Sequence, residues 1–288
     1  MHARALTITA HTGLVGVLGH PVRHSLSPQI HNAAFAAQGV DMVYVAFDVA
    51  PEQLAEALSG IRALGIRGVN VTVPHKEAVV ALLDQIDPPA ARIGAVNTVV
   101  NDQGRLTGFN TDATGFTEAL RSLLPGGARG LRCMLAGAGG AARAVLAALI
   151  ADQAAGVCVY NRTFERAAAL CRDAAEWGPT ECEAVSEERL RAVAPSADVL
   201  VNATSVGLAS EVKDFPVPVD IVHSGLTVVD LVYGKGPTGL VQAARARGAR
   251  AVDGMEMLLM QAGQSYRLWT GLQPPMDAMR ASIERREG

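Results

Sequence analysis

Apolar residues follow two patterns along this chain. Short runs rich in valine, isoleucine and leucine alternate with longer stretches in which apolar positions recur every three or four residues. Runs of the first kind are typical of buried strands and stretches of the second kind of helices, so the alternation predicts an α/β fold with largely parallel sheets. The strands expected in the first half are Leu14–Leu18, Val43–Val49, Gly68–Val73 and Ala95–Val100. The helices expected between them are Ser27–Gln38, Pro51–Leu64 and His75–Leu83.

The second half of the chain repeats this alternation after a turn-rich stretch at residues 124–130. A helix is expected at Ala141–Ala151, and the final stretch, Met255–Arg286, is helical in pattern with an interruption at Gly271–Pro275. The expected strands are Arg132–Ala136, Val157–Tyr160, Val199–Asn202, Val228–Leu231 and Ala249–Val252. The turn-rich stretch therefore predicts a boundary between two α/β domains close to residues 124–130.

Composition narrows the class of protein. The 288 residues carry 25 Lys+Arg against 28 Asp+Glu, a net charge of −3, which provides no basic field for a nucleic-acid backbone. The most membrane-like stretch, Leu131–Ala151, contains Arg132, Arg143 and a glycine turn, so we expect no transmembrane span. The residues before the turn at Gly13 lack the pattern of a signal peptide. We expect a cytoplasmic protein with neither a nucleic-acid nor a membrane partner.

Cysteine and histidine spacing gives no indication of a metal. The four cysteines have no C-x-x-C spacing and are expected to be reduced thiols. Three histidines, His20, His24 and His31, lie close together but do not match H-E-x-x-H and have no carboxylate between them. Turn and cap positions account for these histidines, and we expect no metal ion.

A glycine-rich turn follows the expected strand Arg132–Ala136. Its residues, 137–142, read G-A-G-G-A-A, with small residues at all three positions of the G-x-G-x-x-G/A fingerprint. The first glycine permits the tight turn, the second lets the backbone approach a diphosphate, and the helix N-terminus faces the anion. A glycine turn without a ligand is the alternative. The strand before it, the helix after it and the second strand some twenty residues on favour dinucleotide binding.

The tip of that second strand indicates which dinucleotide. An acidic residue there would accept a hydrogen bond from the ribose 2′-hydroxyl of NAD. The chain instead has Asn161, Arg162 and Thr163, with Arg166 one helical turn later. Two guanidinium groups and a hydroxyl suit a 2′-phosphate, which favours NADP. The alternative is a pair of solvated arginines, with Glu165 reducing the local positive charge.

Two serines precede the first expected helix. Ser25 and Ser27 flank one residue, so in an extended segment both hydroxyls point to one side and could bind a carboxylate or a hydroxyl. Ser27, followed by Pro28, is also expected to be a helix N-cap. Capping alone would explain Ser27 but not Ser25.

Three polar islands lie in apolar surroundings. In the first, Asn70 and Thr72 share one face of a strand, and Lys76 falls in an expected first helical turn, where the helix dipole disfavours a cation. Such a lysine is suited to acid–base work, although a solvated lysine beside Glu77 is the simpler reading. The other islands are residues 94–98 (G-A-V-N-T) and 108–112 (G-F-N-T-D). Buried Asn, Thr and Asp side chains must find partners or ligands.

Taken together, these islands resemble the shikimate dehydrogenase family. The matching motifs, in the family's order, are G-x-P-x-x-H-S-x-S-P at 19–28, N-V-T-x-P-x-K at 70–76, G-A-V-N-T at 94–98, N-T-D at 110–112, G-A-G-G-A at 137–141, N-R-T at 161–163, N-A-T-S-x-G at 202–207 and D-G-x-x-M-L-x-x-Q at 253–261. Their common order over most of the chain is far more specific than any single motif. The resemblance implies reversible NADP-linked oxidation of shikimate to 3-dehydroshikimate, on the route to chorismate and the aromatic amino acids.

The resemblance also implies a role for particular residues. It implies a first α/β domain, substrate-binding, formed by residues 1–111 and 256–288, and a second, doubly wound and Rossmann-like NADP domain formed by residues 112–255. Lys76 and Asp112 are the implied catalytic pair. The implied substrate-binding residues are Ser25, Ser27, Thr72, Asn97, Asp112, Tyr233 and Gln261. The implied cofactor-binding residues are Gly137, Ala138, Gly139, Gly140 and Ala141 at the diphosphate, Asn161, Arg162, Thr163 and Arg166 at the 2′-phosphate, and Leu231, Gly254 and Met257 at the nicotinamide.

Lys76 is expected to receive the hydroxyl proton in oxidation and return it in reduction, with Asp112 hydrogen-bonded to the same hydroxyl and to the ammonium group. Three alternatives remain open: a quinate or dual quinate/shikimate dehydrogenase, a non-catalytic NADP-binding sensor, and a folate-linked dehydrogenase of similar design. The last leaves the serine loop unexplained. We expect a monomer or a homodimer.

Overall fold

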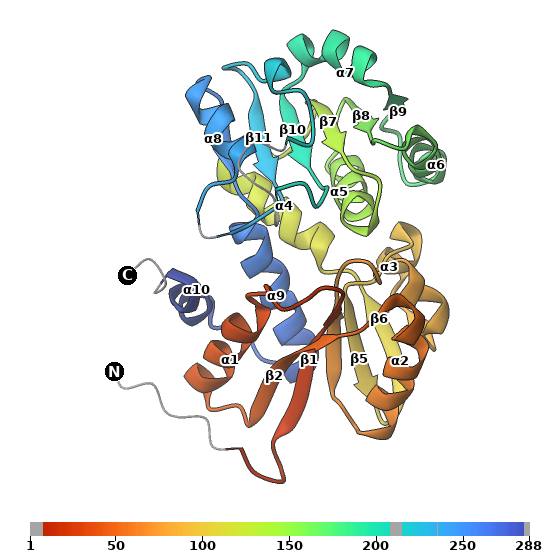
Figure 1. The fold of residues 1–288 in the computed structure, drawn as a ribbon, viewed down its shortest axis with the longest axis vertical. Helices are drawn as coiled ribbons and strands as arrows, with labels where there is room; N and C mark the ends of the chain where they lie inside the picture. The colour runs from red at the N-terminus through yellow and green to blue at the C-terminus, as the bar shows by residue number, and fades with distance from the viewer. Residues whose placement is uncertain (1–7, 208–214, 235, 285–288) are drawn as a thin grey trace. The chain divides into compact units, whose positions relative to one another are not determined.

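The chain divides into two compact units. The computed structural model describes residues 8–207, 215–234 and 236–284. The first unit consists of Met1–Thr111 and Leu259–Gly288, and the second of Asp112–Leu258 (Figure 1). We expected the chain to re-enter the first domain at residue 256. In the structure it re-enters the first unit at residue 259, inside helix α9 (Met255–Thr270). The functions expected of the two domains stay predictions.

A mixed sheet forms the centre of the first unit. Among the described residues its strand order is β2-β1-β3-β5-β6-β4, with β1 paired in parallel to β2 and β3, and β4 in parallel to β6. Strand β5 runs antiparallel to both β3 and β6. The strands are β1 (Gly13–Gly19), β2 (Met42–Asp48), β3 (Gly68–Val71), β4 (Gln85–Ile86), β5 (Thr98–Asp102) and β6 (Arg105–Phe109).

Helices cover both faces of this sheet. On one face, Leu54, Leu58 and Ile61 of α2 pack with Val69 and Val71 of β3 in a single apolar cluster. The other face carries an aromatic group from α1, β2 and α9. The helices are α1 (Ser27–Gln38), α2 (Leu54–Ala63), α3 (Pro88–Ile93), the part of α9 from residue 259, and α10 (Met276–Glu284), with 3-10 turns at η1 (Pro51–Gln53) and η2 (Ala78–Leu82).

The second unit contains a doubly wound parallel sheet, as expected. In the part of the chain that is described, the order β9-β8-β7-β10-β11-β12 reverses direction between β7 and β10. All its strand pairs are parallel. The strands are β7 (Arg132–Ala136), β8 (Gly156–Tyr160), β9 (Cys182–Val185), β10 (Val199–Asn202), β11 (Thr227–Asp230) and β12 (Arg250–Val252). Ligands of such sheets bind at the carboxyl ends of the strands, where the order reverses.

Two apolar clusters lie on opposite sides of this second sheet. One joins the sheet to α4, α5 and α6, and the other joins it to α7 and α8 (Figure 1). The helices are α4 (Asp112–Leu123), α5 (Gly140–Ala151), α6 (Phe164–Ala174), α7 (Glu187–Val193) and α8 (Gly239–Ala246), with 3-10 turns at η3 (Ala194–Ser196) and η4 (Val219–Ile221). The α/β fold class with a Rossmann-like unit is therefore confirmed.

The antiparallel strands of the first unit depart from the purely parallel pattern. Strand β5 begins at Thr98, later than the expected Ala95, and continues directly into β6 through a tight turn. Both central residues of that turn, Gln103 and Gly104, have positive φ, at 50° and 91°. This geometry matches the twist of a two-residue β-hairpin, in which a parallel connection is impossible.

Two local predictions are wrong. The expected helix His75–Leu83 is only the 3-10 turn η2, because the strand before it ends at Val71 and the chain turns through residues 72–77. No helix dipole therefore acts on Lys76. Ser27 is the first residue of α1 rather than its N-cap; Leu26 occupies the cap position and makes no side-chain cap bond.

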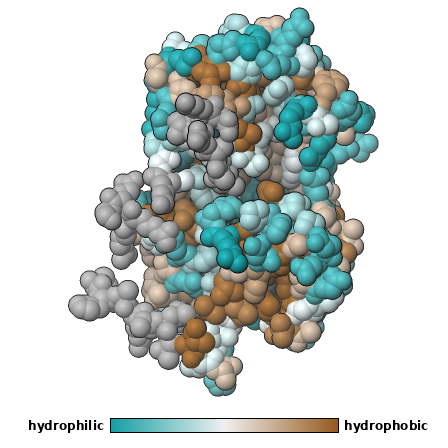
Figure 2. Space-filling view, viewed as in Figure 1, coloured by the Kyte–Doolittle hydropathy of each residue, from teal (hydrophilic) through white to brown (hydrophobic). Residues whose placement is uncertain are grey.

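The surface has a mixed character. Figure 2 shows hydrophilic residues over much of the visible face, with hydrophobic residues exposed in places. Within the described ranges, no helix is both long enough and apolar enough to cross a bilayer.

One histidine of the first unit is buried without a hydrogen bond. His31 on α1 is fully buried, and neither ring nitrogen has a partner. Its ring stacks on Tyr44 with centroids 4.4 Å apart and planes 2° apart, and Trp269 lies against it at 5.3 Å. Burial lowers the pKa of His31 from 6.5 to about 3, so the imidazole is neutral in the folded protein at ordinary pH.

His31 makes the protein sensitive to acid. Between pH 6.5 and 3 the unfolded chain binds a proton at this residue that the folded protein does not, so stability falls as the pH drops through that window. The loss is about 2 kcal/mol at pH 5. We predict that His31→Phe keeps the ring stacking, removes the unpaired nitrogens and raises the free energy of unfolding, by about 2 kcal/mol more at pH 5 than at pH 7.5.

Urea unfolding at the two pH values measures this effect. His75→Phe is the control, because His75 is equally buried but its Nε2 lies 2.7 Å from the carbonyl oxygen of Val49. That substitution should lower stability at both pH values. If the free energy of unfolding of His31→Phe depends on pH as in the wild type, His31 is not the source of the acid sensitivity.

Candidate active site

The carboxyl ends of the first three strands of the first unit are joined by backbone hydrogen bonds. The N–H of His20, after β1, donates to the carbonyl of Val73, after β3, at 3.0 Å. The N–H of Thr72 donates to Leu18 at 2.8 Å. The serine loop and the N-V-T-x-P-x-K island therefore meet at one edge of the sheet, where Thr72 is half-buried.

The serine loop is ordered by Ser25. Its Oγ accepts a hydrogen bond from the N–H of Ser27 at 3.3 Å, and its own N–H donates to Val22 at 3.0 Å. Ser27 is buried and Ser25 is half-buried. Ser25 thus takes over part of the capping expected of Ser27. Substrate binding by both hydroxyls stays a prediction.

Lys76 lies in a turn that is bound to the second island. Its carbonyl oxygen accepts from the N–H of Val96 at 2.8 Å, and the carbonyl of Asn97 accepts from Val71 at 2.9 Å. The residue before Lys76, His75, is held by the hydrogen bond between its ring and the carbonyl oxygen of Val49. The backbone of Lys76 is consequently held on both sides, while its side chain is only half-buried.

Asn97 clamps the end of the first unit. Its Oδ1 accepts from the backbone N–H of Thr111 at 2.7 Å, and its Nδ2 donates to Thr111 Oγ1 at 2.9 Å. Its Nδ2 is also 3.5 Å from Oε1 of Gln261, on α9. Asp112, which follows Thr111 in the chain, is buried and is the first residue of α4, where the helix dipole favours an anion.

Behind Asn97 lies a buried polar network that the sequence did not reveal. Asn70 accepts from Tyr44 Oη at 2.8 Å and donates to Ser265 Oγ at 2.9 Å and to Thr98 Oγ1 at 3.1 Å. Asn70, Thr98 and Ser265 are all buried. Tyr44 and Ser265 were not expected to contribute, whereas Asn70, Thr98 and Thr111 belong to the polar islands. The sequence signal for Ser265 was its position four residues after Gln261, on the same face of a helix.

The two expected catalytic residues come from different units. Lys76 belongs to the first unit and Asp112 opens the second. Their meeting at a single alcohol stays a prediction.

In the second unit, the glycine turn lies where the strand order reverses. The N–H of Gly137 donates to Tyr160, at the end of β8, at 2.8 Å. Gly137 has φ +114°, and a Cβ on it would lie 2.9 Å from the carbonyl oxygen of Ala203, after β10. Helix α5 then begins at Gly140, with Gly139 as an N-cap that offers no side chain. An uncapped helix N-terminus beside a glycine turn suits a diphosphate.

The end of β8 lies beside this turn. Arg166 Nη2 donates to the carbonyl of Ala138 at 3.4 Å, and Asn161 Nδ2 donates to Thr163 at 2.8 Å. Arg162 is exposed. After β8, Arg162 and Arg166 carry guanidinium groups, and that of Arg166 contacts the glycine turn, while Glu165 is in the same first turn of α6.

A buried carboxylate organises the loops after β10 and β11. Asp230 accepts from Asn202 Nδ2 at 2.7 Å, from Thr238 Oγ1 at 2.5 Å and from the N–H of Val232 at 3.1 Å. Burial raises the pKa of Asp230, and these hydrogen bonds act against that rise. Because Leu231 also donates to the carbonyl of Asn202 at 2.9 Å, the two loops are fixed relative to each other.

The residues expected around the nicotinamide come from neighbouring segments of the second unit. A Cβ on Gly254 would lie 2.1 Å from the carbonyl oxygen of Leu231, so only glycine fits there. Met257 is buried on the first turn of α9, and Tyr233 is half-buried. The contact between Leu231 and Gly254 is consistent with a shared wall, but the cofactor roles stay predictions.

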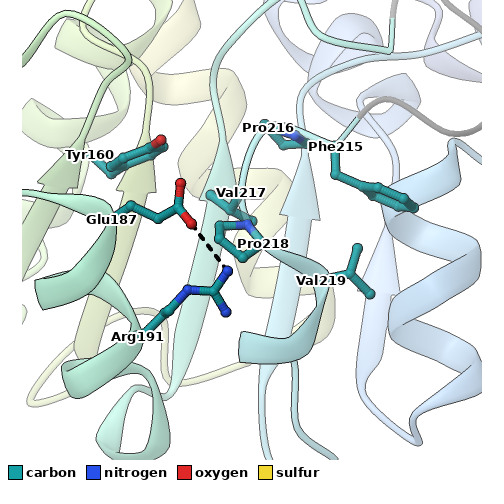
Figure 3. A pocket seen from close by; sticks show the side chains of 8 residues that line it. All are labelled: Tyr160, Glu187, Arg191, Phe215, Pro216, Val217, Pro218 and Val219. Atoms are coloured by element: carbon teal, nitrogen blue, oxygen red, sulfur yellow. Dashed lines mark hydrogen bonds and ion pairs between the residues drawn. The ribbon is translucent and has the colours of Figure 1, made fainter.

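A shallow pocket of about 390 Å³ lies near the end of β8 (Figure 3). It is lined by Tyr160, Glu187, Arg191, Phe215, Pro216, Val217, Pro218 and Val219. The guanidinium of Arg191 is already engaged by Glu187, at 3.0 Å, and by Asp220. None of the expected cofactor residues lines this pocket.

No group of three or more His, Cys, Asp or Glu side chains placed to hold a metal occurs among the described residues.

Models of two known protein domains match this chain, one in each unit. The model of the shikimate dehydrogenase substrate binding domain matches residues 17–99, and that of shikimate / quinate 5-dehydrogenase matches residues 120–211. The chain is 48% identical to the shikimate dehydrogenase (NADP(+)) of Moorella thermoacetica, over 95% of this chain and 93% of that protein.

Solved structures give the same result. The shikimate dehydrogenase of Aquifex aeolicus is 40% identical with a TM-score of 0.87, over 96% of this chain and 99% of that one. The Thermus thermophilus enzyme, solved in complex with NADP(H) and shikimate, is 42% identical with a TM-score of 0.83, over 95% and 99% of the two chains. With family models covering both units and a relative 48% identical along nearly the whole chain, this protein belongs to the shikimate dehydrogenase family.

Proposed function

We propose that this protein catalyses the reversible NADP-linked reduction of 3-dehydroshikimate to shikimate. The observation that carries the proposal is the clamp of Asn97 on Thr111, which joins the polar islands of the first unit at the residue before Asp112. The family membership and the NADP-dependent relatives support the same activity.

The second unit has the residues that NADP needs. The diphosphate would lie against Gly137–Ala141, where a Cβ at residue 137 is excluded and the helix N-terminus is uncapped. The 2′-phosphate would lie against Arg162 and Arg166 at the tip of β8. Leu231, Gly254 and Met257 would line the nicotinamide. Bound NADP supplies the carbon that exchanges a hydride with the substrate.

The first unit supplies the groups that bind the substrate and move its proton. In the direction of oxidation Lys76 takes the proton of the reacting hydroxyl, and in reduction it returns that proton to the oxygen. Asp112 accepts a hydrogen bond from the same hydroxyl and orients the ammonium group. Ser25, Ser27, Thr72, Asn97, Tyr233 and Gln261 bind the rest of the substrate. This requires Lys76 and Asp112 to approach one atom when substrate is bound.

We further propose that the protein works in the cytoplasm, as a monomer or a homodimer. The absence of a membrane-spanning helix among the described residues is compatible with this location.

The experiment that tests the proposed function is a matrix of kcat/KM values for shikimate and quinate, each with NADP and NAD. We expect kcat/KM to be highest for shikimate with NADP, by at least about tenfold. One phosphate–guanidinium contact accounts for such a preference over NAD, and one misplaced hydroxyl for such a preference over quinate. A preference for quinate would identify the protein as a quinate dehydrogenase. No turnover with either acid would leave the sensor alternative.

We predict that Lys76→Ala lowers kcat by a factor of about 10² to 10⁴ with a smaller change in the KM for shikimate, because the variant loses the group that transfers the proton. Steady-state kinetics measures both constants. Arg105→Ala is the control, since it removes a cation from the exposed start of β6 in the same unit. A Lys76→Ala variant with near-normal kcat would remove Lys76 from the chemistry.

A further inference from the structure

Ser265 is a buried hydroxyl to which neither the resemblance nor the proposed mechanism gives a role. It lies on α9, four residues after Gln261, and is fully buried. Its Oγ donates to the carbonyl oxygen of Gln261 at 3.0 Å. A serine that makes a hydrogen bond only within its own helix needs no further explanation. Ser265 also has hydrogen-bond partners on three other segments of the chain.

Those partners surround its oxygen. Asn70 Nδ2, from β3, lies at 2.9 Å, Thr98 Oγ1, from β5, lies at 2.9 Å, and Thr111 Oγ1, from the segment after β6, lies at 3.3 Å. A serine hydroxyl has one donor and two acceptor sites. With its proton on Gln261, Ser265 Oγ accepts from Asn70 and from one threonine, and its hydrogen-bonding capacity is filled.

The partners of Ser265 are the residues that hold the substrate-facing groups. Thr98 Oγ1 lies 3.2 Å from Oδ1 of Asn97, the same oxygen that accepts from the Thr111 N–H. The Asn70 amide is oriented from both ends, by Tyr44 at its oxygen and by Ser265 at its nitrogen. One hydroxyl thus fixes the helical turn that carries Gln261 relative to Asn97.

We propose that Ser265 is a positioning residue for substrate binding, which holds Gln261 and Asn97 in register without touching the substrate. This rests on the proposed function. Its removal takes from Asn70 Nδ2 the shortest of three hydrogen bonds, leaving those to the carbonyl oxygen of Asn97 and to Thr98 Oγ1, both at 3.1 Å. Because Asn70 and Thr98 both contact Asn97, we expect these buried groups to rearrange around Asn97. The hydrogen bonds that Gln261 and Asn97 make to the substrate would then be lost or lengthened.

The test compares Ser265→Ala with wild type and with Ser59→Ala. Ser59 is the matched control, because its Oγ makes the same kind of bond to the residue four positions earlier, Ala55, at 3.0 Å, but on an exposed face of α2. We expect Ser265→Ala to raise the KM for shikimate about tenfold, the size of effect typical of one misplaced hydrogen bond. The KM for NADP should stay within about twofold of wild type.

A double-mutant cycle separates positioning from general stability. If Ser265 acts through Asn97, adding Ser265→Ala to Asn97→Ala should cost less than about twofold more, because the group it positions is already gone. Should Ser265→Ala fail to fold, Ser265→Cys keeps the volume with a weaker donor and acceptor, and the same comparisons apply.

A wild-type KM for shikimate in Ser265→Ala, equal losses for shikimate and NADP, or fully additive losses in the double mutant would each overturn the proposal. Wild-type protein that does not oxidise shikimate would instead overturn the proposed function itself.

Discussion

The hydrogen bonds between Asn97 and Thr111 are the constraint on which the first unit depends. A buried amide and a buried backbone N–H each cost free energy unless they are paired, on the order of 1–3 kcal/mol per group. Their partners, Asn70, Thr98 and Ser265, are buried as well and are satisfied mainly by one another. The sheet, the part of α9 in the first unit and the segment at Thr111 must therefore assemble together or leave several polar groups unpaired.

The second unit also has a buried hydrogen-bond network, but a carboxylate rather than an amide lies at its centre. Asp230 replaces the amides as the centre of the network, and it accepts hydrogen bonds from the loops that follow β10 and β11. In both units the polar groups gather at the sheet edge where parallel strands end, and in the first unit that edge also holds the amino end of the antiparallel strand β5. A network of this kind, once every member is paired, holds loops rigidly next to a ligand site.

The sequence predicted the second unit better than the first. Short apolar runs alternating with helical stretches and the fingerprint at Gly137 indicate a parallel sheet, because each signal is local. The antiparallel pairing of β5 with β6 could not be read in the same way. The chain reverses there at Gln103 and Gly104, and glutamine is not a residue that usually signals such a turn. The expected helix at His75–Leu83 failed because bonds to Val96 and Val49, both distant in the sequence, hold that segment in a turn.

For the candidate site, the identities of the residues could be predicted and their connections could not. Ser25, Lys76 and Asn97 stand out as polar residues in apolar surroundings. Ser265 does not, because its partners come from β3, from β5 and from the segment after β6, and only folding brings them together. His31 likewise gave no sign that both its nitrogens would be buried without partners.

Amide hydrogen exchange at Thr111, resolved by NMR, tests most directly whether Asn97 fixes the chain before Asp112. If it does, the Thr111 N–H in wild type exchanges at least about 1,000-fold more slowly than a free peptide, and Asn97→Ala abolishes most of that protection while amides within β1 keep theirs. Fast exchange in the wild type, or equal protection in both proteins, would contradict the account.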